Sequence, residues 1–201
     1  EYQATTGYPS FKYEVKAVES QEDLVVASNL NKARGTDVSL AFNHALIQLN
    51  FSAGLTTGFT YAITNISISG VNNSGTFTYS NSIGDWTAQD GTASYAYAGD
   101  FNGTITDNVL KLSTGSNALM LMPQTVPAGA EISITYTATA NSTNQVTFNG
   151  TKKVAIGGVE WKKGSNICYK LILPTGAEAI TYSTVVNPWG EEDSQDKTTQ
   201  P

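Results

Sequence analysis

The sequence predicts an all-β protein, an antiparallel β-sandwich with Greek-key connections. Most of the chain consists of short segments in which apolar and polar residues alternate, the pattern of half-buried strands. Clusters of Gly, Asn, Asp and Pro separate these segments at spacings of about 8–14 residues. No segment sustains the period of an amphipathic helix. The expected strands are 38–43, 45–53, 59–70, 75–80, 93–98, 109–113, 118–122, 130–140, 145–148, 152–156, 166–173 and 179–186.

The stretch VSLAFNHALIQLNF, residues 38–51, carries the strongest strand pattern, but the pattern changes phase within it. Its apolar residues first share one parity and then the other: Val38, Leu40 and Phe42, followed by Ala45, Ile47, Leu49 and Phe51. In an unbroken strand such a change would turn half of the apolar side chains to solvent. We therefore predict a β-bulge or a crossing from one strand to another near Asn43–Ala45.

The dipeptide Asn149-Gly150 is the strongest hairpin signal in the chain. It lies between the alternating segments 145–148 and 152–156. Both central residues of a type I′ turn need a positive φ, which Asn and Gly adopt readily. We therefore predict a two-residue turn at this point.

Composition divides the chain into three parts. Residues 1–33 hold a short strand around Phe11–Val15, another at 24–27 and part of a hydrophilic link, so we interpret them as the remnant of a preceding domain with its linker. Residues 34–190 form the sandwich. The acidic tail 191–201 has no apolar residue and is predicted to be disordered. Glu1 is expected to be the start of a processed or trimmed chain.

Charge and cysteine content exclude several classes of function. The net charge is −6, and the 11 Lys and Arg residues are scattered, which argues against binding to nucleic acid or to an anionic membrane. A single cysteine, Cys168, excludes an intrachain disulfide, and its apolar strand context indicates a packed residue rather than a nucleophile. No apolar run approaches the ~18 residues of a membrane span, so no direct membrane insertion is expected.

Three stretches, in this order, resemble the fimbrillin family, the pilin and tip subunits of Bacteroidales-type (type V) fimbriae. They are VSLAFNHAL at 38–46 leading to Phe51, ALMLMPQ at 118–124 followed by ISITY at 132–136, and WKKG at 161–164 followed by YKLIL at 169–173. The resemblance implies a transthyretin-like, fimbrillin-type sandwich without enzymatic activity or cofactor. It also implies an extracellular location in a fimbria attached to the outer membrane, other fimbrial subunits as partners in a homo- or heteropolymer, and a host glycan or protein receptor.

Family members usually carry two β-sandwich domains, and nearly all of the first is missing from this sequence. Family polymerisation begins when a protease removes a strand from that first domain, and a neighbour's strand fills the groove. The arginine cleavage site of the family lies in the missing part. Position alone therefore does not assign that role to Arg34, which lies in the hydrophilic link.

The segment AITYSTVV, residues 179–186, is the candidate donor strand. Ile180, Tyr182, Thr184 and Val186 share one face, which could fill a neighbour's groove by β-addition. The alternative is that the same segment is the last strand of its own sandwich. The sequence leaves both open.

No residue is expected to act in catalysis or to bind a metal. His44 is the only histidine, no second potential His or Cys ligand lies near it, and no G-x-S-x-G motif is present. We predict a structural His44 satisfied by backbone groups.

The segment 83–107 is the most suggestive region for ligand binding. Its aromatic residues could stack on a sugar while neighbouring acidic residues accept hydrogen bonds; the candidate patch is Trp86, Tyr95, Tyr97 and Phe101. The simpler interpretation is a strand face with acidic turns. The alternative function is therefore a secreted or surface carbohydrate-binding module.

Overall fold

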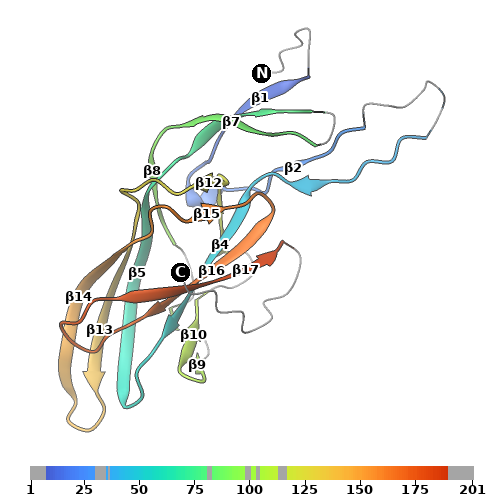
Figure 1. Ribbon diagram of the computed structural model, residues 1–201. Coiled ribbons are helices and arrows are strands. Elements are labelled where there is room, and N and C mark those ends of the chain that lie inside the picture. Colours follow the sequence, from blue (N-terminus) through green and yellow to red (C-terminus); the bar gives the residue numbers. More distant parts are fainter. Residues whose placement is uncertain are drawn as a thin grey trace.

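The computed structural model describes residues 8–29, 35, 37–80, 83–97, 101–102, 105–112 and 117–189 (Figure 1). Ten strands form its sandwich: β4 (Ile47–Gly54), β5 (Phe59–Val71), β8 (Ala93–Ala96), β9 (Ile105–Thr106), β10 (Val109–Lys111), β11 (Leu119–Leu121), β13 (Glu131–Ala140), β14 (Gln145–Ala155), β16 (Ser165–Ile172) and β17 (Thr181–Pro188). One sheet has the order β17-β16-β4-β10-β9, with β11 also paired to β4, and the other has the order β14-β13-β5-β8. The predicted all-β sandwich is confirmed.

Smaller elements cover one end of the sandwich. They are β1 (Ser10–Glu14), β2 (Val25–Val26), β3 (Asn43–His44), β6 (Ser74–Thr78), β7 (Asp85–Asp90), β12 (Gln124–Thr125), β15 (Glu160–Trp161) and a 3-10 turn at Val18–Ser20. β1, β6 and β7 form a three-stranded sheet, whereas β2 pairs with β3 and β12 with β15. These elements bring residues far apart in sequence to the same end of the molecule (Figure 1).

The core lies between the two large sheets. β13 alternates strictly, and its inward residues Ile132, Ile134, Tyr136 and Ala138 are all buried. Burying an apolar side chain of this size contributes about 1.5–3 kcal/mol, so this one face fixes the register of the four-stranded sheet.

One strand pair departs from the antiparallel prediction. β4 and β16 run parallel, with Leu49 opposite Ile167 and Phe51 opposite Tyr169. Seven of the eight residues of β4 are buried, as expected for a central strand that is covered on both faces. The sequence pattern of a single strand does not record the direction of its neighbour.

The predicted crossing near Asn43–Ala45 is confirmed. β3 ends at His44, β4 begins at Ile47, and the two strands belong to different sheets. The predicted strand 38–43 is wrong over most of its length, because only its last residue pairs, with Val26 of β2. Residues 37–42 belong to no β-ladder.

The predicted turn at Asn149-Gly150 is wrong, because both residues lie inside the continuous strand β14. The chain turns instead at residues 141–144, where Asn144 has a φ of 55°. Gly150 lies opposite Tyr136, and the side chain of Phe148 packs against the ring of Tyr136 at a centroid distance of 4.6 Å. Pairing along the whole of β13 prevails over the local turn preference of the dipeptide.

The N-terminal segment packs on the same folded body as the sandwich. β1 pairs with β6 through residues such as Phe11 opposite Phe77, and Val15 is buried in the main core. The packing therefore does not divide the chain at residue 33. Arg34, most of the hydrophilic link and the predicted tail 191–201 lie outside the described residues.

Candidate functional site

The first candidate site is the outer edge of β17. β17 pairs with β16 on one side only and ends its sheet. It is eight residues long, its sequence TYSTVVNP carries no charge, and its Val186 is 55% exposed. A long uncharged edge offers backbone groups and apolar side chains to another strand.

The other strands that end a sheet are shorter or charged. β14 carries Lys152 and Lys153, β7 begins and ends with Asp85 and Asp90, and β1 contains Lys12. β8 has four residues, β11 three and β9 two. Charges on an edge and short edges both oppose pairing with another chain. Among the described strands that end a sheet, β17 is therefore the one long strand without such protection. The first half of β5, residues 59–65, pairs only with β13 and is a second uncharged stretch of edge.

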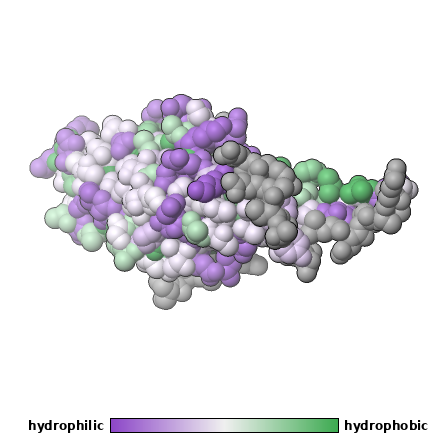
Figure 2. Space-filling view, turned by 90° about the horizontal axis from the view of Figure 1, so that it is seen from above, coloured by the Kyte–Doolittle hydropathy of each residue, from purple (hydrophilic) through white to green (hydrophobic). Residues whose placement is uncertain are grey.

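The second candidate site is an arm that projects from the body and consists of β2, β3 and the segment 37–42 (Figure 1). Val38, Leu40 and Phe42 are 56%, 48% and 66% exposed. Val25 on the arm is also exposed. Figure 2 shows hydrophobic residues along the arm where it extends beyond the body. Contiguous exposed apolar side chains of this kind mark a surface that binds another molecule.

The base of the arm is fixed by His44. Its Nδ1 lies 2.8 Å from Oδ2 of Asp23, and its ring stacks on Trp189 at a centroid distance of 4.1 Å and an interplanar angle of 3°. The predicted structural role of His44 therefore has side-chain partners in place of the expected backbone ones. Because Trp189 follows β17 directly, the stack joins the base of the arm to the end of the uncharged edge.

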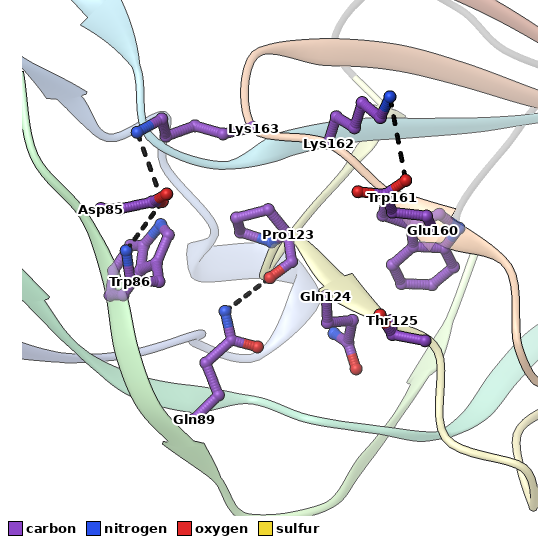
Figure 3. A pocket seen from close by; sticks show the side chains of 10 residues that line it. All are labelled: Asp85, Trp86, Gln89, Pro123, Gln124, Thr125, Glu160, Trp161, Lys162 and Lys163. Atoms are coloured by element: carbon purple, nitrogen blue, oxygen red, sulfur yellow. Dashed lines mark hydrogen bonds and ion pairs between the residues drawn. The ribbon is translucent and has the colours of Figure 1, made fainter.

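The third candidate site is a polar pocket of about 410 Å³ between β7 and the β12–β15 pair (Figure 3). Lys163 lies 3.4 Å from Asp85, and Lys162 lies 3.8 Å from Glu160. The Gln89 amide donates to the carbonyl of Pro123 at 2.5 Å. The four charged side chains sum to zero, so the pocket offers many donors and acceptors without favouring a charged ligand.

The residues of the predicted aromatic patch are separated in the structure. Tyr95 and Tyr97 are buried in the core, where their hydroxyl groups donate to the carbonyls of Val15 and Leu112. Burial raises the pKa of Tyr95 to about 12 and raises the pKa of Tyr97 further. Neither ring is available to a ligand, which corrects the predicted patch for these two residues. Phe101 is partly buried against the same core.

Trp86 alone of the predicted patch lines the polar pocket. Its indole nitrogen donates to the carbonyl of Ala45 at 2.6 Å, and its ring packs edge-on against Phe77. The other pocket residues come from β7, from Pro123 and β12, and from β15 and the loop after it. Several of them lie in the stretches 118–124 and 161–164, but nothing in the sequence indicated that these stretches line a common pocket. The elements are brought together by tertiary packing, which local sequence patterns do not report.

The described part of the chain lacks two features. No group of His, Cys, Asp and Glu side chains there could hold a metal ion. No helix there is long and apolar enough to cross a membrane.

Comparison with known families decides the classification. The family described as Fimbrillin-like matches residues 2–189, nearly all of the chain. The chain belongs to this family. The resemblance in the three stretches is thereby confirmed, and the fimbrillin-like family is one of structural proteins, so no catalytic role is assigned. No curated protein matches the sequence.

Two solved structures show the same fimbrillin-like fold. A fimbrial protein from Bacteroides vulgatus has a TM-score of 0.71 and 19% identity over 92% of this chain and 69% of its own. A protein from Bacteroides uniformis designated as a cell adhesion protein has a TM-score of 0.56 and 18% identity over 93% of this chain and 68% of its own. At these identities the similarity extends to the fold alone.

Proposed function

We propose that this fimbrillin-like chain is a structural subunit of a cell-surface fimbria that joins its neighbours by β-strand addition and supports adhesion. The observation that carries the proposal is the uncharged outer edge of β17 in a family of fimbrial subunits. Strand addition supplies main-chain hydrogen bonds along an edge and buries alternate side chains. Head-to-tail contacts of this kind produce open filaments.

Donation of the strand 179–186 to a neighbour is one form of this assembly. Within the subunit, Ile180 is buried and the ring of Tyr182 packs on Tyr169 at a centroid distance of 5.3 Å. Thr184 and Val186 of the same face pair with Tyr169 and Ile167. Donation would therefore exchange these contacts for equivalent ones in the neighbour.

Truncation after residue 178 tests the donated strand. A folded monomer that no longer self-associates, measured by circular dichroism and light scattering, would show that assembly needs β17, as donation requires. An unfolded chain would show that β17 belongs to the core of its own subunit, and donation would then be rejected.

Electron microscopy of the source bacterium tests the fimbrial role itself. Antibodies raised against the folded chain should label fimbriae that extend from the outer membrane. Deletion of the gene should remove or shorten the labelled fimbriae and reduce attachment to host cells. Unchanged fimbriae without label would contradict the proposal.

A second candidate function, carbohydrate binding, is favoured by the polar pocket. The pocket volume of about 410 Å³ falls in the ~300–1,000 Å³ range of small-molecule sites. Its neutral mixture of carboxylate, ammonium and amide groups matches the hydroxyl groups of a sugar, and Trp86 offers an aromatic surface. Such binding would give the fimbria a host glycan receptor.

Titration with galactose, N-acetylglucosamine and lactose tests this function by calorimetry or ligand-observed NMR. Binding that is weakened in Glu160→Gln and Lys162→Ala, both exposed and away from the core, would support it. Binding that is unchanged in both variants would place the sugar elsewhere. Lys111→Ala, on β10 in the sandwich, is the matched control.

A further inference from the structure

We propose that residues 37–42 of the arm add to the outer edge of β17 in a second copy of this chain. This inference rests on the proposed fimbrial function and specifies its contact. It assigns the donor to a segment outside the sandwich and makes β17 the acceptor, so that β17 stays in its own sheet.

The arm segment has the properties of a strand that lacks a partner. Its backbone belongs to no β-ladder, and Val38, Leu40 and Phe42 recur at every second position with about half or more of each side chain exposed. The amides of Asn29 and Asn43 donate to the carbonyls of Ser39 and Ala41, which holds this segment against its own arm. A preordered segment loses less conformational entropy when it pairs.

The β17 edge is the acceptor that fits this donor. Edges β14, β7 and β1 carry charges that an apolar strand would have to desolvate, whereas β17 contains no charged side chain. The donor 37–42 carries one charge, on Asp37 at its first position. The eight residues of β17 exceed the six of the segment 37–42, so the edge is long enough to span the donor. Exposed Val186 lies beside the added strand and gains cover from its apolar residues.

Within one subunit, residues 37–42 of the arm cannot pair with the outer edge of β17 in the arrangement that the structure shows. The stack of His44 on Trp189 fixes the base of the arm at the end of β17, and from there the arm projects away from the sheet (Figure 1). A contact from arm to edge therefore needs a second copy. Because donor and acceptor are different surfaces, the contact can repeat from copy to copy, and it gives an open filament where its rotation does not close a ring.

Disulfide trapping between two single-cysteine chains tests the contact directly. Both chains carry Cys168→Ser, which removes the natural thiol. One chain carries Leu40→Cys and the other Val186→Cys. On mixing and mild oxidation we expect a mixed disulfide dimer. The matched control replaces Val186→Cys with Val146→Cys, a residue of similar exposure (52%) on the charged edge β14, and should give no such dimer.

Association measured by light scattering supplies the second readout, since it does not depend on the cysteines. Phe42→Ser on the arm and Val186→Lys on the edge should each weaken self-association by about tenfold or more, with unchanged circular dichroism, while Val146→Lys should have no effect. Oligomers that persist in both variants, without the mixed disulfide, would overturn this contact and leave the fimbrial function standing. A chain that stays monomeric at every concentration overturns the contact as well. Labelled fimbriae on the cell would then still support the fimbrial function.

Discussion

Phe42 and Phe51 belong to one alternating stretch of sequence, but one side chain is exposed and the other is buried. Phe51 on β4 is fully buried and packs edge-on against Tyr97 at a centroid distance of 4.9 Å, whereas Phe42 on the arm is 66% exposed. The difference arises at His44, where the chain leaves the arm and enters the sandwich. Alternation of apolar residues predicts an extended backbone, but the partner of that backbone can lie in the same chain or in another.

The comparison also explains why an exposed apolar segment is tolerated. Val38, Leu40 and Phe42 are not part of the core of the sandwich, so its packing does not depend on these three side chains. The arm can therefore keep apolar side chains for an intermolecular contact at no cost to the core.

Truncation of the two phenylalanines should separate the two regions most clearly. Phe51→Ala removes a buried ring from a packed core and should lower the free energy of unfolding by about 3–5 kcal/mol. Phe42→Ala should change it by less than about 0.5 kcal/mol. Urea denaturation of both variants as monomers measures the difference. Similar losses in the two variants would mean that the arm packs on the body in solution.

Sequence patterns predicted the buried strands of the sandwich better than the exposed segment of the arm. Strict alternation in segments such as 130–140 located the strand that became β13, and the phase change at His44 located the crossing. The exposed segment was predicted as a strand because an alternating pattern is the same whether or not a neighbouring strand pairs with it.

The polar pocket and the parallel pairing of β4 with β16 could not be predicted for a different reason. Both depend on tertiary packing, which local sequence patterns do not record. Gln89 and Pro123 meet only because β7 packs against the end of the sandwich. No local pattern relates two residues that lie 34 positions apart in the sequence. The pattern around Tyr95 and Tyr97 was visible, but a strand face alone does not state which face meets the core.

Alkaline pH should destabilise the buried core of the sandwich. Burial raises the pKa of Tyr95 from 10.0 to about 12, so the folded state favours the neutral phenol. The resulting stability is present below pH 10 and is lost as the pH rises through about 12. The displacement sets an upper limit of roughly 2–3 kcal/mol, which solvent screening lowers.

Urea denaturation of the native chain and Tyr95→Phe as a function of pH measures this contribution. The free energy of unfolding should fall more steeply above pH 10 in the native chain, because the variant cannot ionise at this position. Other buried tyrosines are present in both chains and cancel in the difference. Parallel curves would show that Tyr95 is hydrated in the folded protein.

Trp189→Ala tests the contact that joins the base of the arm to the end of β17. The variant loses the stacked contact with His44, which should lower the free energy of unfolding by about 1 kcal/mol. Amide hydrogen exchange at Val25 and His44 should become faster, since the base of the arm loses its support. Trp189→Phe keeps an aromatic ring and should retain most of the protection. Unchanged exchange in Trp189→Ala would mean that the Asp23–His44 pair alone fixes the arm.

The smallest effect on stability, with the clearest effect on assembly, is expected from the charges of β14. The double variant Lys152→Thr/Lys153→Thr removes the ion pair of Lys153 with Glu131 and the hydrogen bond from Lys152 to the carbonyl of Glu178, both exposed, at about 0.5 kcal/mol or less. It also makes β14 a second long uncharged edge. If charge is what distinguishes β14 from β17, the variant should form larger assemblies that Val186→Lys no longer abolishes. Lys152→Arg/Lys153→Arg keeps the charge and should behave as the native chain. Assemblies that are unchanged in the threonine variant would show that the shape of the β17 edge, and not its lack of charge, selects the partner strand.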